Sequence, residues 1–169
     1  MYFIHRALKN IYQGLDLVNI HLFHDASNLI AVNSSPSIYS ANRKKALRYV
    51  INRWDQISDN PSNPIPFFLF GDFNFRLDTL TLVQVWMDIV SNNTQLLKYD
   101  KEITSFHDVI REEDITFPPS YPYIEDSNQP KQYMNTRCPA WCDRILMSHT
   151  AHDLINRVSW TCIFSAMWS

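Results

Sequence analysis

The chain has 169 residues, of which 46% are hydrophobic and 14% aromatic, and its formal net charge at pH 7 is -2. This composition is sufficient for one packed domain, excludes wholesale disorder, and argues against a generally basic nucleic-acid binder. The two glycines, Gly14 and Gly71, are too few for a GxxxxGK phosphate-binding loop or a GxGxxG dinucleotide turn. A phosphate ligand would therefore have to be held by side chains.

The expected location is cytoplasmic. The sequence has no apolar run of signal-peptide length, and no segment reaches the roughly 18 apolar residues that a bilayer-spanning helix needs. The three cysteines cannot all pair, and a reducing compartment would keep them as thiols.

The first half of the chain predicts a strand, a helix and a second strand. Residues 15–23 ("LDLVNIHLF") form a mostly apolar strand with Asn19 and His21 on one face. Residues 40–58 predict a helix capped by Ser40, on which residues 43–45 ("RKK") are interpreted as a solvated face. The apolar run "FFLF" in "FFLFGDFN" then predicts a buried strand, and this order predicts a βαβ-type crossover.

The second half predicts shorter elements. Apolar spacing favours a helix over residues 80–90 and a third, short helix over residues 105–114, with Ser105 and Asp108 as its capping box. The three prolines of "FPPSYPY" require a loop, and "WCDRILMS" is typical of another buried strand.

The residues after the "FFLF" strand are candidates for chemistry. Asp72, Asn74 and Arg76 point to one side if the chain stays extended. A carboxylate and an amide suit Mg²⁺ or a positioned water, and a guanidinium suits a phosphate or carboxylate. On pattern alone, turn hydrogen bonds remain the stronger alternative. The pattern likewise favours His21 as a core histidine, with a functional role left open.

The segment "RCPAWCDRIL" carries two cysteines, but their spacing from His149 and His152 disfavours zinc, and a cytosolic chain disfavours a disulfide. The thiols are therefore predicted to be packing residues. Asp143 and Arg144 are predicted to be buried charges, which require either an internal ion pair or an anionic ligand.

Together, "FGDFNFRLD" and "RCPAWCDRIL" resemble the two signature motifs of the inositol polyphosphate 5-phosphatases. The segments "NIHLFHDASN", "FPPSYPY" and "QYMNTRCPAWCDRILMS" are similar to the type I branch, which is directed at inositol 1,4,5-trisphosphate. The resemblance implies a mixed α/β, DNase-I-like sandwich of two β-sheets flanked by helices, with a Mg²⁺-dependent phosphatase site.

By resemblance, His21 contacts the scissile phosphate, Asp72 holds or polarises the attacking water, and Asn74 helps to bind the phosphate oxygens. Asp143 and Arg144 are expected to brace the site internally, and Tyr133 and Arg137 lie on a loop that approaches the substrate. The motifs leave the metal ligands undefined. The full set predicted to bind substrate consists of Asn19, Arg76, Tyr121, Tyr133, Arg137, Asp143 and Arg144.

The resemblance also implies features that the sequence lacks, namely a metal-binding glutamate upstream, a terminal Asp-His motif and a C-terminal prenylation signal. The expected unit is therefore one partial catalytic domain over residues 1–169, incomplete at both ends. The match is strongest over residues 16–148, and residues 149–169 form a divergent tail.

Two functions follow. The first is a Mg²⁺-dependent phosphatase that removes the 5-phosphate of inositol 1,4,5-trisphosphate, or of inositol 1,3,4,5-tetrakisphosphate, with little activity expected from this chain alone. The alternative is an inactive inositol-phosphate or phosphoinositide binder that uses Arg76, Arg137 and Arg144. The expected partner is a soluble inositol polyphosphate. The chain is expected to be monomeric, to bind no nucleic acid, and to associate with membranes at most peripherally in the full-length protein.

Overall fold

The computed structural model describes residues 3–6, 14–25, 37, 39–57, 64–78, 94–126, 128, 132–134 and 138–154. The predicted helix over residues 80–90 and the tail beyond residue 154 lie outside these ranges. The described helices and strands, in chain order, are β1 (Phe3–Arg6), β2 (Asp16–His21), α2 (Ser40–Ile57), β3 (Phe67–Asp72), the 3-10 helices η2 (Thr94–Tyr99) and η3 (Ile103–Phe106), β4 (Ile110–Glu112), β5 (Asp143–Ser148) and α3 (His149–Leu154).

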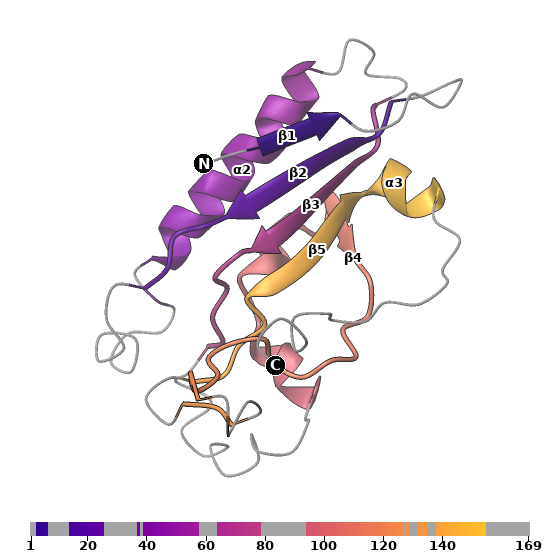
Figure 1. Ribbon diagram of the computed structural model, residues 1–169. Helices are drawn as coiled ribbons and strands as arrows, with labels where there is room; N and C mark the ends of the chain where they lie inside the picture. Colours follow the sequence, from indigo (N-terminus) through magenta and orange to yellow (C-terminus); the bar gives the residue numbers. More distant parts are fainter. Residues whose placement is uncertain are drawn as a thin grey trace.

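The strands form one five-stranded sheet in the order β1-β2-β3-β5-β4 (Figure 1). β2 and β3 are parallel and are joined through α2, whereas the other pairs are antiparallel. The predicted βαβ crossover is therefore confirmed. The fold is mixed α/β, as predicted, and of the two expected sheets the described ranges contain this one.

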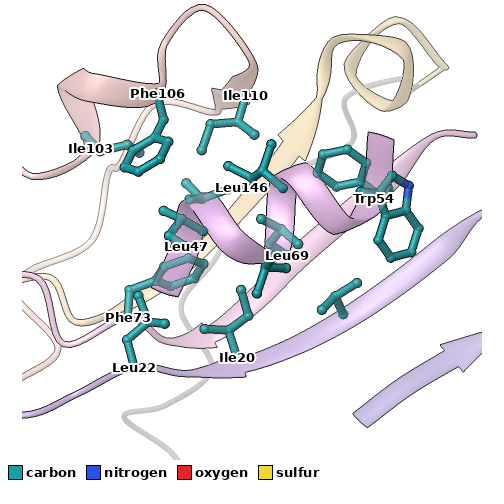
Figure 2. Close-up of a cluster of buried hydrophobic side chains, with 14 of the residues drawn as sticks. Ile20, Leu22, Leu47, Trp54, Leu69, Phe73, Ile103, Phe106, Ile110 and Leu146 are labelled. Atoms are coloured by element: carbon teal, nitrogen blue, oxygen red, sulfur yellow. The ribbon is translucent and has the colours of Figure 1, made fainter. Parts of the chain in front are cut away.

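A large apolar cluster occupies the face of the sheet that α2 and η3 cover (Figure 2). Alternate residues of the strands reach it, as the pleat of a strand requires. Its buried members are Val18, Ile20, Leu22, Leu47, Val50, Ile51, Trp54, Phe67, Leu69, Phe73, Phe75, Ile103, Phe106, Ile110 and Leu146. The alternate residues Leu17, Asn19 and His21 of β2, and Phe68, Phe70 and Asp72 of β3, lie on the opposite, less buried face.

The start of α2 differs from the predicted cap by one residue. The N–H of Arg43 donates to the carbonyl of Tyr39 at 2.9 Å, which places Tyr39 at the N-cap position and Ser40 inside the helix. The hydroxyl oxygen of Ser37 accepts the N–H of Tyr39 at 3.2 Å. The N-cap position is therefore one residue earlier than the serine pattern indicated. No described helix is long and apolar enough to cross a bilayer.

The predicted helix over residues 105–114 is wrong. η3 ends at Phe106, and Ile110–Glu112 forms β4, which pairs with β5. Ile110 is buried in the apolar cluster and lies opposite Ser148. Pairing with β5 satisfies the backbone of this segment and buries Ile110, and this tertiary interaction overrides the local helical spacing.

The loop predicted for "FPPSYPY" is confirmed, although it is ordered by isolated backbone bridges. Tyr121 bridges Ala140, and Tyr123 bridges Tyr133. The Tyr121–Pro122 peptide bond is cis. These bridges hold the loop beside the chain that leads into β5.

Gly71 lies one residue before the end of β3, and a side chain cannot be accommodated there. Its φ is +129°, which L side chains rarely adopt, and a Cβ atom would lie 2.2 Å from the carbonyl oxygen of Ile20 on β2. Gly71 therefore permits the close approach of β2 and β3 at the point where both strands end.

Candidate active site

Three polar side chains form a row across the ends of three neighbouring strands. His21 ends β2 and lies opposite Asp72, which ends β3, and Asp72 lies opposite Asp143, the first residue of β5. The Nε2 atom of His21 and the Oδ2 atom of Asp72 are 3.9 Å apart. The strand register thus brings together residues that are far apart in the sequence.

The row lies on the open face of the sheet. The side chain of His21 is 70% exposed and that of Asp72 is 35% exposed. The interpretation of His21 as a core histidine is therefore wrong, because position 21 falls on the opposite face from the buried Val18 and Ile20. Asn19 lies two residues before His21, on the same face, and is half-buried. An imidazole, a carboxylate and a second carboxylate are open to a ligand at this edge.

The chain does not stay extended after Asp72, so the predicted alternation of three side chains is wrong. Asn74 has a φ of +53°. A hydrogen bond of 2.8 Å from the N–H of Asn74 to Oδ1 of Asp72 closes this turn. Such a turn is typical of aspartate and asparagine, which tolerate the left-handed region. The alternative of turn hydrogen bonds is therefore confirmed. These bonds, rather than an extended strand, bring Asp72, Asn74 and Arg76 together.

Asn74 connects the two loops that leave β2 and β3. Its Nδ2 donates to the carbonyl of Leu22 at 3.1 Å, and its Oδ1 accepts from Nη2 of Arg76 at 3.1 Å. Only 5% of Asn74 is exposed, and one of its two amide N–H groups is used by Leu22. Asn74 thus fixes the backbone beside His21 relative to the turn after Asp72.

Arg76 extends from this turn onto an aromatic ring. Its guanidinium carbon lies 4.7 Å from the centre of the Tyr121 ring. Its Nε is buried and has no hydrogen-bond partner in the structure. Stacking orients the guanidinium plane beside Asn74, and this orientation suits an anionic ligand.

Ser120 from the proline-rich loop fixes Asp143. Its hydroxyl oxygen accepts the N–H groups of Cys142 at 3.1 Å and Asp143 at 3.0 Å. Burial raises the pKa of Asp143 above its ordinary value of 3.8, and the charge of Asp72 adds to the rise, whereas the hydrogen bond with Ser120 and the charge of His21 lower it. Asp143 and Asp72 therefore repel each other when both are ionised.

This raised pKa predicts a pH dependence of stability. The folded protein retains a proton on Asp143 at pH values where the unfolded chain has released it, so stability contributed by this group declines as pH rises above about 3.8. We expect Asp143→Asn to remove that decline. Urea unfolding of the wild type and of Asp143→Asn at several pH values between about 3.5 and 7 checks this prediction. If the free energies of unfolding of the two proteins changed in parallel with pH, the prediction would be contradicted.

Arg144 points to the other face of β5 and is fully engaged within the protein. Its guanidinium pairs with Asp100 and Glu112, donates from Nη1 to the carbonyl of Trp141 at 3.3 Å, and lies over the ring of Phe75. The Arg144 side chain is 2% exposed. The internal ion pair is confirmed, and the predicted direct contact of Arg144 with substrate is wrong because its charge is already compensated.

Arg43 on α2 is a second buried cation, and its assignment to a solvated face is wrong. It has no exposed surface and pairs with Asp25 and Glu102, each at 2.6 Å. The sequence pattern that could have revealed this position is its spacing, since Arg43 precedes the buried Leu47 by four residues and lies on the same apolar stripe. Glu102 also contacts the turn after β3, whereas Asp25 lies on the chain that follows β2.

Tyr133 lies on the proline-rich side of the site, where it bridges Tyr123. The rings of Tyr123 and Tyr133 stack with centroids 4.6 Å apart, and the Tyr133 hydroxyl donates to the Pro119 carbonyl at 2.7 Å. Burial raises the pKa of Tyr133. The structure thus places Tyr133 in the packing of this loop. Arg137 lies outside the described residues.

Cys138 and Cys142 are free thiols. Burial raises the pKa of Cys138 to about 11 and that of Cys142 to about 12, so both stay protonated at neutral pH. Cys142 is buried, and its thiol donates to the carbonyl of Phe75 at 3.6 Å. The prediction that these cysteines are packing residues is confirmed, because Cys142 belongs to a buried apolar cluster and Cys138 packs against it.

Residues 3–169 match the family described as Endonuclease/Exonuclease/phosphatase family 2. The chain belongs to this family. Inositol polyphosphate-5-phosphatase A of Canis lupus familiaris is 45% identical over 190 residues, covering 84% of this chain and 45% of that protein. A probable type I inositol 1,4,5-trisphosphate 5-phosphatase of Caenorhabditis elegans is 28% identical, covering 83% of this chain and 52% of its own length.

Among solved structures, the inositol polyphosphate 5-phosphatase domain of SPsynaptojanin, in complex with inositol (1,4)-bisphosphate and calcium ion, is similar to this chain. The TM-score is 0.56 at 25% identity, and the match covers 80% of this chain and 39% of that domain. The resemblance to the inositol polyphosphate 5-phosphatases is thereby confirmed. The chain spans about half the length of the curated relatives that it matches.

Proposed function

We propose that this chain takes part in removing the 5-phosphate of inositol 1,4,5-trisphosphate, with inositol 1,3,4,5-tetrakisphosphate as a second substrate. By consuming the trisphosphate, this reaction would end a calcium signal. The observation that carries the proposal is the row of His21, Asp72 and Asp143 on the open edge of the sheet. Relatives at 45% identity are inositol polyphosphate 5-phosphatases, which supports the substrate class.

The chemistry of the row suits hydrolysis of a phosphomonoester. In-line attack requires a water that loses a proton and donors that stabilise charge on the phosphate oxygens. Asp72 is partly exposed and is the group that would orient the water and accept its proton. His21, which is exposed beside it, would donate to a phosphate oxygen. Arg76, stacked on Tyr121, would contribute positive charge from the same side.

Mg²⁺ is proposed as the cofactor by family resemblance, and the calcium ion in the SPsynaptojanin complex agrees with a metal-dependent site. Carboxylate oxygens such as those of Asp72 are ligands that Mg²⁺ prefers. However, no three His, Cys, Asp or Glu side chains gather into a metal-binding group within the described ranges. The described side chains therefore do not form a complete Mg²⁺ site. The roles proposed above for Asp72, His21 and Arg76 are roles of these side chains themselves.

The absence of such a group from the described ranges favours one alternative, a protein that binds inositol phosphates or phosphoinositides without hydrolysing them. The same His21 and Arg76 would hold the anion. Hydrolysis would then fail for lack of a metal-activated water. Binding and turnover must therefore be measured separately.

We further infer that the chain is monomeric, acts on soluble inositol phosphates in the cytoplasm, and does not bind nucleic acid. The net charge of -2 supports the last inference. Pro122 stands where lipid-directed members of the family are expected to carry a lysine, which supports a soluble substrate. Any membrane association would be peripheral.

The deciding experiment incubates the full chain with inositol 1,4,5-trisphosphate and Mg²⁺ and measures released phosphate with malachite green. We expect slow, Mg²⁺-dependent release, stopped by a chelator. Calorimetry with the same compound runs in parallel. Binding that weakens with salt, without any released phosphate, would select the non-enzymatic alternative, and neither binding nor release would refute both functions.

A further inference from the structure

The segment Asp100–Lys101–Glu102 is a short acidic strap behind the site. Its side chains alternate between buried and exposed positions. Asp100 pairs with Arg144, Lys101 with Asp78 at 3.0 Å, and Glu102 with Arg43. The strap therefore joins β5, the chain after β3 and helix α2 through three different ion pairs.

Glu102 is the member of the strap that touches the site turn itself. Its Oε1 accepts from Nη2 of Arg43 at 2.6 Å and from the backbone N–H of Arg76 at 3.1 Å, and its Oε2 accepts from Nε of Arg43 at 2.9 Å. Only 4% of Glu102 is exposed. One buried carboxylate thus links α2 to the turn that follows Asp72.

The far end of the Arg43 guanidinium reaches the other loop. Its Nη1 donates to the carbonyl of Phe23 at 3.1 Å and to Oδ1 of Asp25 at 2.6 Å. These residues follow His21 and Leu22 at the end of β2. The Glu102–Arg43 pair therefore spans both chain segments whose side chains make the site, and Asn74 joins the same segments on the site side through Leu22.

We propose that Glu102, held by Arg43, is a positioning residue for the phosphate site. The turn at Asn74 has a positive φ, which asparagine tolerates, and it ends the extended conformation of β3. The hydrogen bond from Arg76 to Glu102 anchors the chain two residues beyond Asn74. This anchor keeps Asn74 and Arg76 facing the His21–Asp72–Asp143 row. The expected effect of Glu102 on turnover or ligand binding rests on the proposed function. The expected effect of Glu102 on the turn does not depend on that function.

The test replaces Glu102 by glutamine in the full chain, with Glu112→Gln as the matched control. Glu112 is also a glutamate paired through both oxygens with a buried arginine, Arg144, but it lies on β4. Both variants lose a carboxylate that pairs with a buried arginine, so a general loss of stability affects both. Native-state hydrogen exchange measures the amides of residues 74–77 against those of α2 in each protein.

We expect Glu102→Gln to speed exchange at residues 74–77 about tenfold more than in α2, whereas Glu112→Gln does not single out this turn. We also expect kcat for phosphate release to fall about tenfold or more, with KM changed less than about threefold. Equal exchange changes in the two variants, or a loosened turn with unchanged kcat, would overturn the proposal.

A wild-type chain that releases no phosphate would refute the hydrolytic function without deciding the role of Glu102. In that case, calorimetry with inositol 1,4,5-trisphosphate replaces the rate measurement. About tenfold weaker binding by Glu102→Gln, with the exchange change confined to the turn, supports the positioning role. Unchanged binding refutes it.

Discussion

Replacing Asp72 by asparagine should lower phosphate release from inositol 1,4,5-trisphosphate by about 10²- to 10⁴-fold while the protein stays folded. An asparagine side chain keeps an oxygen that can accept the N–H of Asn74, so the turn after β3 is retained. It loses the negative charge that faces His21 and that would accept a proton from water. The malachite green assay measures the rate, and thermal unfolding confirms the fold.

Two further variants make this prediction specific. Asp72→Ala removes both the charge and the turn hydrogen bond, so we expect a comparable loss of rate and a lower melting temperature. Asp153→Asn makes the same chemical change on α3, where the side chain is 81% exposed, and should leave the rate unchanged. Turnover by Asp72→Asn within about threefold of wild type would show that this carboxylate does not act on the attacking water.

The regular elements beside the site could be predicted because their patterns are local. A β-branched run, an amphipathic stripe and a short apolar run predicted β2, α2 and β3 in the correct order. The helix predicted over residues 105–114 was wrong because its helical spacing is weak, and because pairing with β5 buries Ile110 in the apolar cluster. Pairing partners far apart in the sequence leave no local signal.

The composition of the site could be predicted, but its geometry could not. Asp72 and Asp143 lie in the two signature motifs and His21 in the segment "NIHLFHDASN", and the strand register places all three in one row. The positive φ of Asn74 ends the extended conformation of the chain. Hydrogen bonds, rather than the alternation of side chains along a strand, therefore bring Asp72, Asn74 and Arg76 together. A period-two pattern could not reveal that change of backbone conformation.

The buried charges were the hardest residues to interpret. A charged residue on a helix is usually solvated, so Arg43 appeared ordinary beside two lysines. Its burial depends on Asp25 and Glu102, which approach it only in the folded chain. For Arg144, the sequence left open an internal ion pair and an anionic ligand. Asp100 and Glu112, its ion-pair partners, come beside it only in the folded chain.

Replacing Arg144 by methionine should lower the free energy of unfolding by about 3–5 kcal/mol at pH 7, because it leaves two buried carboxylates without their cation. Oδ1 of Asp100 is already buried without a hydrogen-bond partner. Urea unfolding measures the loss. Arg111→Met on β4 is the control. Arg111 is exposed and its Nε donates to Nδ1 of His149 at 3.2 Å, so this change should alter stability by about 0.5 kcal/mol or less.

The loss should also depend on pH, and the sign follows from Glu112. Burial raises the pKa of Glu112 above 4.5 even though Arg144 lowers it. Without Arg144 the pKa of Glu112 rises further, so Glu112 keeps its proton in the folded variant at pH values where the unfolded chain has released it. The stability of the variant therefore falls as pH rises above about 4.5. The deficit relative to wild type should therefore shrink when unfolding is measured near pH 4.5. A deficit that stays constant between pH 4.5 and 7 would mean that lost packing against Phe75, rather than unpaired charge, causes it.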